Sequence, residues 1–192
     1  MQVQCIPVRA EEGAVIEALS AFATEIVREH FDPIIGKAQN DYMLARSQSA
    51  SGIREQIEGG ARYYIAADQD GKWLGFTAFY PRGNEMYLSK FYVHKSQRGK
   101  GVARCMLELM IHAAKEAGLE KISLNVHRHN DLAIGVYEKM GFVIARAEQI
   151  DIGQGFVMDD FVYEYRLGQV KKEEKCKTPL QSEKDRHIIL IF

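Results

Sequence analysis

The first third of the chain carries the hydrophobic period of helices. Apolar residues three and four positions apart share one face between residues 10 and 29, which predicts an amphipathic helix there. Weaker signals predict a second helix over about 38–46 and a short one over 53–57, which Gly59–Gly60 would end. Asp32–Pro33 predicts a turn between the first two helices.

Strands are predicted where bulky apolar residues alternate with polar ones between turn residues. The first covers residues 3–8, and Pro7 within it favours a sheet edge because proline cannot donate to a ladder. Further strands are predicted over 63–67, 73–80, 85–94, 121–126, 142–150 and 156–165, with helices over 102–117 and 130–140 between the later ones. The strands from 63 to 94 form an antiparallel meander, and the strand that follows the next helix is expected to lie parallel to the meander's last strand. This order predicts an α/β (α+β) fold around a mixed sheet.

Length and composition narrow the class of protein. The 192 residues suit one domain, and 46% hydrophobic with 27% charged residues is typical of a soluble globular chain. A net charge of −1 argues against general nucleic-acid binding. No signal peptide, membrane span or cysteine–histidine metal cluster is evident. The three cysteines, Cys5, Cys105 and Cys176, are predicted to be reduced thiols, so we expect a cytoplasmic protein without a metal.

A basic, glycine-containing loop joins the strand at 85–94 to the following helix. Residues 95–100 form the loop, and Gly101 starts the helix. The first turn of a helix has backbone N–H groups without intrahelical partners, and the helix dipole adds positive charge there. Glycine lets an anion approach the backbone closely. The stretch therefore predicts a phosphate-binding site, to which Arg98, Lys100 and Arg104 add charge.

The spacing within the loop selects among phosphate-binding motifs. A P-loop would need Gly-Lys-Ser/Thr after four intervening residues, and a dinucleotide fingerprint would need a third glycine near Arg104. What stands there is Arg98-Gly99-Lys100-Gly101-Val102-Ala103, which reads Arg-x-x-Gly-x-Ala. This resembles the Gln/Arg-x-x-Gly-x-Gly/Ala signature of the GNAT superfamily of acetyl-CoA-dependent N-acetyltransferases.

A second run strengthens the resemblance. Asn130, Ala133, Tyr137 and Gly141-Phe142 match the family's Asn-x-x-Ala-x-x-x-Tyr-x-x-x-Gly-Phe pattern, and both motifs occur in the family's order. The resemblance covers about residues 86–165. It implies a mostly antiparallel, seven-stranded sheet flanked by helices, with a splay between the strands at 86–94 and 121–126.

The resemblance also implies site residues. The strand Phe91-Tyr92-Val93 looks like the one that pairs with the pantetheine arm, Asn130 is expected to contact the coenzyme, and Tyr137 is expected to protonate the leaving thiolate. The implied coenzyme-binding residues are Phe91, Tyr92, Val93, Arg98, Gly99, Lys100, Gly101, Val102, Ala103, Arg104, Asn130 and Tyr137. Within the superfamily, the Asp32-Pro33 region and the run around Asp159-Asp160 are similar to bacterial spermidine/spermine-type members and unassigned relatives, which implies a small polycationic acceptor.

Acetyl transfer to an amine needs no nucleophilic side chain, but the amine must lose its proton. An amine of pKa about 10.4 costs roughly 4–5 kcal/mol to deprotonate at pH 7. A polyamine therefore needs a base and several carboxylates. Glu85 is the candidate base, and Glu85, Asp159 and Asp160 are the candidate acceptor-binding acids, with Glu12 weaker.

Two neighbouring residues have simpler interpretations. His94 is expected to be structural at the end of its strand, and Cys105 is expected to pack within the fold.

Other functions stay open beside polyamine acetylation. The same fold could acetylate a protein N-terminus or a lysine, or it could bind acyl-CoA without catalysis. Residues 1–167 are expected to form the enzyme domain and 168–192 a charged extension with an apolar end at 188–192. That end would dock on the domain, dock on a second copy to give a homodimer, or have no function.

Overall fold

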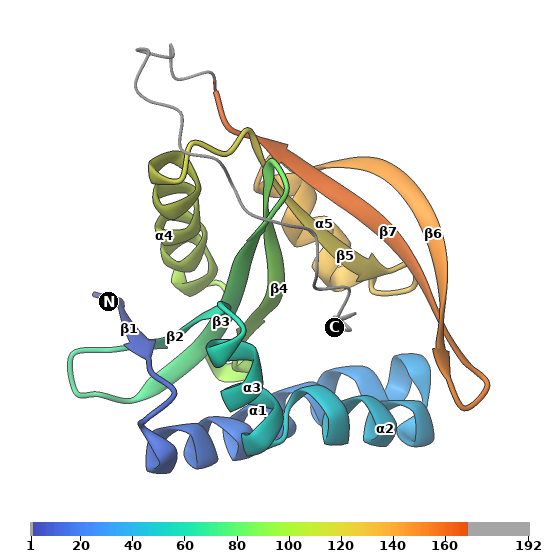
Figure 1. The fold of residues 1–192 in the computed structure, drawn as a ribbon, viewed down its shortest axis with the longest axis horizontal. Helices are drawn as coiled ribbons and strands as arrows, with labels where there is room; N and C mark the ends of the chain where they lie inside the picture. Colours follow the sequence, from blue (N-terminus) through green and yellow to red (C-terminus); the bar gives the residue numbers. More distant parts are fainter. Residues whose placement is uncertain (1, 169–192) are drawn as a thin grey trace.

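A computed structural model of the protein describes residues 2–168 (Figure 1). Its strands form one seven-stranded sheet in the order β1-β2-β3-β4-β5-β7-β6. The strands are β1 (Gln4–Val8), β2 (Arg62–Ala67), β3 (Trp73–Arg82), β4 (Glu85–Val93), β5 (Lys121–His127), β6 (Val143–Gly153) and β7 (Phe156–Arg166). The helices are α1 (Gly13–Ile35), α2 (Lys37–Ser47), α3 (Ala50–Glu58), α4 (Val102–Glu116) and α5 (Asp131–Lys139), with a 3-10 turn over Lys95–Gln97.

The pairing of the strands confirms the predicted mixed sheet. Strands β1 to β4 form an antiparallel meander, and β5, β7 and β6 form a second antiparallel set. The only parallel pair in the described sheet is β4 with β5. Strand β1, which contains Pro7, lies at one edge as its proline predicts.

Helices cover the sheet on both faces (Figure 1). Helices α1, α2 and α3 pack on one face, where α1 contributes Ile16, Leu19, Ile26 and other residues to the core with β1 to β4. Helices α4 and α5 pack on the other, against β4, β5 and β7. The β6–β7 hairpin extends back to α2, where the Tyr42 hydroxyl donates to the carbonyl of Ile152 over 2.9 Å.

Strands β4 and β5 pair only at one end. Their register joins Glu85–Tyr87 to Lys121–Ser123 and stops there. Because both strands continue for several residues, they separate toward Val93 and His127. This is the splay that the family resemblance implied, and it opens the sheet where the site lies.

A bulge in β4 sets which side chains face each layer. Ala78 pairs with Lys90 and Phe79 pairs with Leu88, so Ser89 is an extra residue in β4. Before it, Leu88 faces the α4 side of the sheet; after it, Phe91 does, while Tyr92 packs with the α1 core.

The turn predicted at Asp32–Pro33 is wrong. Helix α1 continues through Pro33 to Ile35 and ends before Gly36, which has a φ of 81°. Burial explains the extension, because Phe31 is in the core and Ile34 and Ile35 pack against it. Tertiary burial here outweighs the cost of proline near a helix end.

The structure also describes two of the three cysteines and all of the helices predicted before residue 168. Cys5 and Cys105 are free thiols, as predicted, and their sulfur atoms lie 3.7 Å apart, a contact that the sequence did not predict; Cys176 lies outside the described residues. None of the helices in residues 2–168 is long and apolar enough to cross a membrane. The extension was predicted for residues 168–192, and all of it after residue 168 lies outside the described residues.

Candidate active site

A cavity of about 520 Å³ opens where β4 and β5 separate. Its walls come from five elements: the ends of β4 and β5, the loop and first turn of α4, one face of α5, and the last turns of α1. The predicted motifs thus meet around one space, although more than 25 residues separate the loop from α5. Eleven of the twelve predicted coenzyme-binding residues line it: Phe91, Tyr92, Val93, Arg98, Gly99, Gly101, Val102, Ala103, Arg104, Asn130 and Tyr137.

The entrance of α4 forms an open anion cradle. Gly99 and Gly101 have φ values of 75° and 85°, a left-handed conformation that other residues rarely adopt. No side chain caps the first turn, and a Cβ built on either glycine would meet no atom within 4 Å. The N–H groups of this turn therefore have room for a charged acceptor, with the helix dipole in its favour.

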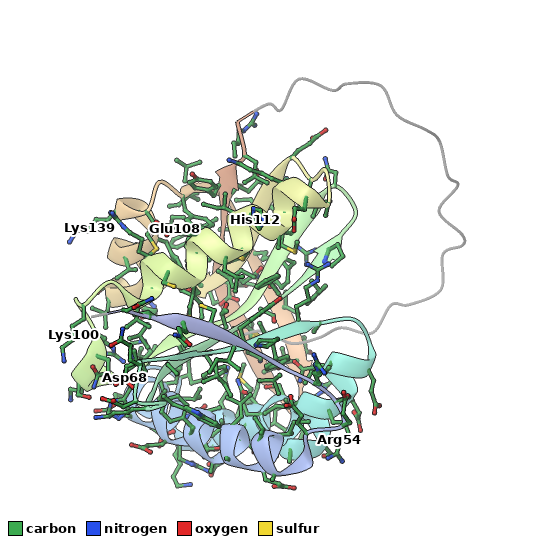
Figure 2. All side chains as sticks on the ribbon, turned by 90° about the vertical axis from the view of Figure 1, so that its left-hand side faces the viewer. Arg54, Asp68, Lys100, Glu108, His112 and Lys139 are labelled. Carbon is green, nitrogen blue, oxygen red and sulfur yellow. The ribbon has the colours of Figure 1, made fainter. Side chains whose placement is uncertain are left out.

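The basic residues of the loop point in different directions. The Arg98 side chain donates to the carbonyl of Val93 over 3.2 Å and lines the cavity. Arg104 also lines it from the first turn of α4. Lys100, the twelfth predicted residue, extends outward at the tip of the loop (Figure 2) and does not line the cavity; its ammonium donates to Gln97. The loop therefore brings two guanidinium groups to the cavity.

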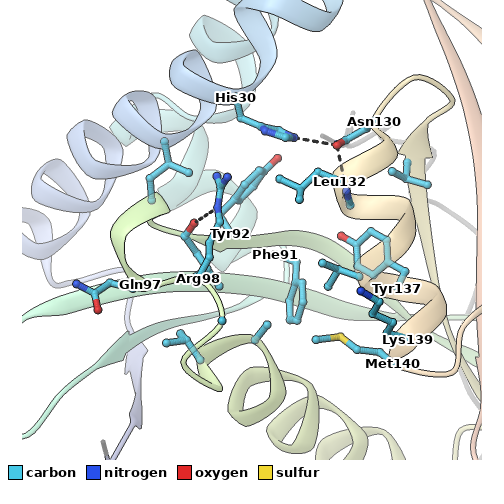
Figure 3. Close-up of a pocket in the computed structure, with 18 of the residues that line it drawn as sticks. His30, Phe91, Tyr92, Gln97, Arg98, Asn130, Leu132, Tyr137, Lys139 and Met140 are labelled. Atoms are coloured by element: carbon cyan, nitrogen blue, oxygen red, sulfur yellow. Dashed lines mark hydrogen bonds between the residues drawn. The ribbon is translucent and has the colours of Figure 1, made fainter.

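Tyr137 of α5 faces the cavity opposite β4 (Figure 3). Its ring lies among aromatic neighbours, 6.1 Å from Phe91 and 5.7 Å from Phe142 between centroids. Burial raises the pKa of the phenol well above its ordinary value. Its hydroxyl has no hydrogen-bond partner among residues 2–168, so it is a protonated donor with no competing acceptor.

Asn130 joins α5 to α1 across the cavity. Its side-chain oxygen accepts from the Ala133 N–H over 3.3 Å, which caps α5. The same oxygen lies 2.9 Å from Nε2 of His30 (Figure 3). Burial lowers the pKa of His30, so the neutral ring donates this bond. The cap and the bridge together fix the mouth of the cavity on the α5 side.

The structure does not bring Glu85 to the cavity. Glu85 begins β4, whereas the cavity lies at the other end and begins at Phe91, about 20 Å away at about 3.3 Å per residue. Burial opposes its ionisation, but Arg82 at 2.6 Å and Lys121 at 3.5 Å outweigh burial, and the pKa of Glu85 is lowered. A carboxylate held by two cations is a poor base, so its position gives the predicted role no support.

The other predicted acids also separate. Asp159 forms an ion pair with Arg128 over 2.5 Å and lines neither cavity described here. Asp160 is 1% exposed and lines a smaller cavity beside the main one. Glu12 accepts from the Arg9 N–H before α1, away from the cavity. Of these acids, only Asp160 reaches the region of the site.

His94 acts as a local cap in the described structure. Its ring accepts from the Ser96 N–H at the start of the 3-10 turn, and it does not line the cavity. This agrees with the structural role expected from the sequence.

Sequence reasoning missed five polar residues that line the cavity, His30, Gln97, Asn125, His127 and Lys139. Helical spacing held a signal for His30, because it follows the buried Ile26 by one turn. Strand alternation held a signal for Asn125 and His127, which share one face of β5. Neither signal says that these faces meet, since that depends on how α1 and β5 pack.

Comparisons with known proteins agree with this geometry. The sequence model of the family described as "Acetyltransferase (GNAT) family" matches residues 24–142. The chain is 33% identical over 72 residues to "Uncharacterized N-acetyltransferase YdgE" of Bacillus subtilis (strain 168), a match covering 38% of this chain and 45% of that protein. It is 30% identical over 136 residues to "Putative phosphinothricin acetyltransferase YwnH" of the same organism, covering 68% of this chain and 77% of that protein.

Solved structures share the fold. The PaiA N-acetyltransferase of Thermoplasma acidophilum, in complex with coenzyme A, superposes with a TM-score of 0.71 at 20% identity over 86% of this chain and 99% of that one. Nourseothricin acetyltransferase superposes with a TM-score of 0.52 at 23% identity over 57% of this chain and 67% of that one. At these identities the similarity is one of architecture.

Proposed function

The chain belongs to the acetyltransferase (GNAT) family, and we propose that it transfers the acetyl group of acetyl-CoA to the primary amine of a small molecule. One observation carries the proposal: the uncapped entrance of α4 and the phenol of Tyr137 line the same cavity, between two strands that have separated. An anion cradle and a proton donor on one space are what a thioester of coenzyme A requires.

The cavity residues suit coenzyme A. The first-turn N–H groups of α4 hold the diphosphate, and each hydrogen bond to a charged acceptor contributes about 1.5–3 kcal/mol. Arg98 and Arg104 neutralise its charge. The pantetheine arm lies along Phe91–Val93 at the end of β4, where no strand pairs on the β5 side. Gly99 and Gly101 have no side chains, so the backbone beside the diphosphate stays accessible.

Tyr137 protonates the thiolate as it leaves. A phenol whose pKa burial has raised keeps its proton at neutral pH. The amine attacks the acetyl carbon directly, so the main work of the protein is to hold two substrates in line and to move two protons.

The acceptor is proposed at the level of a small-molecule amine. The polyamine expectation depended on Glu85, Asp159 and Asp160 together, and only Asp160 reaches a cavity. A polyamine binds through several carboxylates, and the described site does not gather them. Relatives named for phosphinothricin and nourseothricin support small acceptors as a class.

The test is acetyl-CoA consumption by the purified chain with a panel of amines. The panel contains monoamines, spermidine, amino acids, a peptide with a free N-terminus and a peptide with an internal lysine. We expect thiol release with a small-molecule amine and an acetylated product by mass spectrometry. Turnover with the peptides alone would replace the proposal by a protein acetyltransferase. Tight acetyl-CoA binding without any turnover would leave a non-catalytic binding module.

A further inference from the structure

A second, smaller cavity of about 20 Å³ adjoins the first and shares Phe31, Asn125 and His127 with it. That volume holds one water-sized group. It lies between α1, α2 and the paired strands β5 and β7. An ammonium group is of this size, and it would need a hydrogen-bond acceptor among the side chains that line the cavity.

Asp160 provides an unsatisfied acceptor in this cavity. Its side chain is 99% buried, since the residue is 1% exposed. Oδ2 lies 3.4 Å from Nδ2 of Asn125, and Oδ1 has no hydrogen-bond partner in the described structure. A buried carboxylate oxygen without a partner is costly, and this one belongs to a side chain that lines a cavity.

The neighbouring carboxylates already have cations. Asp159 pairs with Arg128 over 2.5 Å. Glu148 pairs with Arg146 over 3.1 Å and accepts from Nδ2 of Asn125 over 2.6 Å. Asp160 forms no ion pair among residues 2–168. The cluster therefore has one uncompensated negative charge, which fits one positive charge from a ligand.

The other walls of the small cavity combine apolar side chains with the neutral polar residues Gln39, Asn125 and His127. Phe31, Ile35, Met43 and Met158 line it together with Asp160. Because an ammonium group fills this cavity, the body of the ligand would lie in the larger one, where Ile26, Phe31 and Val126 favour an apolar body.

We infer that Asp160 binds the ammonium group of the acceptor and takes its proton, and that the acceptor is a small monoamine with an apolar body. This inference rests on the proposed function and names the acceptor side of that site. Asp160 would then be a catalytic residue that the coenzyme-binding motifs do not include.

Protons and electrons balance in the proposed acetyl transfer. The ammonium gives one proton to Oδ1 of Asp160, and the freed nitrogen lone pair forms the C–N bond to the acetyl carbon. The C–S bond breaks, and the sulfur takes its bonding electron pair and a proton from the Tyr137 hydroxyl. The nitrogen still carries two protons at this point; it gives one to the tyrosinate, which leaves the neutral amide and restores the phenol, and Asp160 releases its own proton to solvent.

The electrostatic surroundings suit a base. Burial raises the pKa of Asp160 to about 7; the hydrogen bond from Asn125 opposes this, Glu148 and Asp159 raise the value further, and Arg128 lowers it. A base whose pKa lies near the working pH combines a large ionised fraction with a strong pull on the proton.

The remaining groups around Asp160 are neutral near pH 7. His127 on β5 lies opposite Asp160 on β7 in the sheet, and burial lowers the pKa of the His127 imidazole. Tyr87 on β4 has a pKa that burial raises. From α1 and α2, the side chains that line the small cavity carry no charge. Asp160 is thus the group expected to titrate here around neutrality.

The experiment compares kcat/KM against pH for wild type, Asp160→Asn and the control Asp70→Asn. Asp70 is an exposed carboxylate in the β2–β3 turn. The probes are 2-phenylethylamine, an apolar monoamine, and spermidine. We expect wild-type kcat/KM for 2-phenylethylamine to fall about tenfold per pH unit below about 7. Asp160→Asn should lose about 10²–10⁴-fold at pH 8 together with that dependence, with an unchanged Kd for acetyl-CoA; Asp70→Asn should match wild type.

A second variant tests the role in an active enzyme. Glu148→Gln removes a negative charge beside Asp160, so the acid limb should move to lower pH. Asp160→Asn with wild-type kcat/KM, an acid limb that Glu148→Gln does not move, or a preference for spermidine would each overturn the inference and leave the proposed function standing. A wild-type chain that binds acetyl-CoA but acetylates no amine would overturn both.

Discussion

Burial acts in the same direction on Tyr137 and Asp160. It raises the pKa of each, because a charged oxygen is poorly solvated inside the fold. For the phenol, the shift keeps a proton available at neutral pH. For the carboxyl, it moves ionisation into the neutral range, where the group can accept a proton. One physical cause thus suits both the proposed acid and the proposed base, which line adjoining cavities.

Tyr137→Phe should lower kcat about 10²–10⁴-fold, because the ring and its packing stay while the proton donor is lost. Steady-state kinetics and coenzyme titration check this, and the Kd for acetyl-CoA should change little. Tyr165→Phe is the matched control, since its ring also contacts Phe142 but does not line the cavity. Unaltered turnover in Tyr137→Phe would remove Tyr137 from the mechanism.

Asp160→Asn should stabilise the fold at alkaline pH. The folded pKa of about 7 lies above the ordinary 3.8, so the native state binds the proton more tightly. The stability that this carboxyl contributes is fully present below about pH 4 and is lost as pH rises through 7. The variant should melt about 2–8 °C above wild type at pH 8, with a smaller difference at pH 5. Thermal melts at both pH values measure this, and a variant less stable at pH 8 would contradict it.

The elements show where sequence patterns suffice and where they do not. Strand alternation and glycine turns predicted the strands of the described sheet, and the two motifs with the end of β4 predicted eleven of the residues that line the larger cavity. The end of α1 was missed because burial of Phe31 and its neighbours carries the helix past Pro33. Glu85 was expected near the acceptor because it belongs to the strand that leads into the loop. Membership of β4 does not show which end of that strand lies at the cavity, and Glu85 lies at the other end.

Gly101 tests the cradle at the entrance of α4. Gly101→Ala should weaken coenzyme A binding, and Gly101→Asp should weaken it more, by about tenfold or greater, since a charge is added beside the diphosphate. Gly118 follows the other end of the same helix with a φ of 68°, so Gly118→Ala imposes similar backbone strain away from the cavity. Calorimetric titration separates the two; equal losses at both glycines would mean that strain, and not the cradle, explains the effect.

At the scale of the whole molecule, the cavity lies between two parts of the sheet. Strands β1 to β4 form one part and β5 to β7 the other, and their direct pairing is limited to the start of β4. A ligand that contacts α4 and α5 together bridges both parts. Its binding energy should therefore appear as stability of the entire fold.

Coenzyme A at about 100 times its Kd should raise Tm by about 5–10 °C, because such binding adds about 2.7 kcal/mol to the native state. Differential scanning fluorimetry measures the shift. Pantetheine at the same concentration lacks the diphosphate and should produce a much smaller one. Equal shifts with both compounds would argue against diphosphate binding at α4.

The bulge at Ser89 makes changes of chain length unequal along β4. Shortening the strand before Ser89 would only draw in the turn at Gly83. Removing Ser89 itself would restore the regular alternation and keep Phe91 toward α4 and Tyr92 toward α1, whereas inserting one residue after it, with the bulge kept, would exchange the two layers. We therefore expect loss of this serine to be accepted and a one-residue insertion between Ser89 and Phe91 to be rejected, so the bulge contains the residue that this strand can lose without exchanging its two faces.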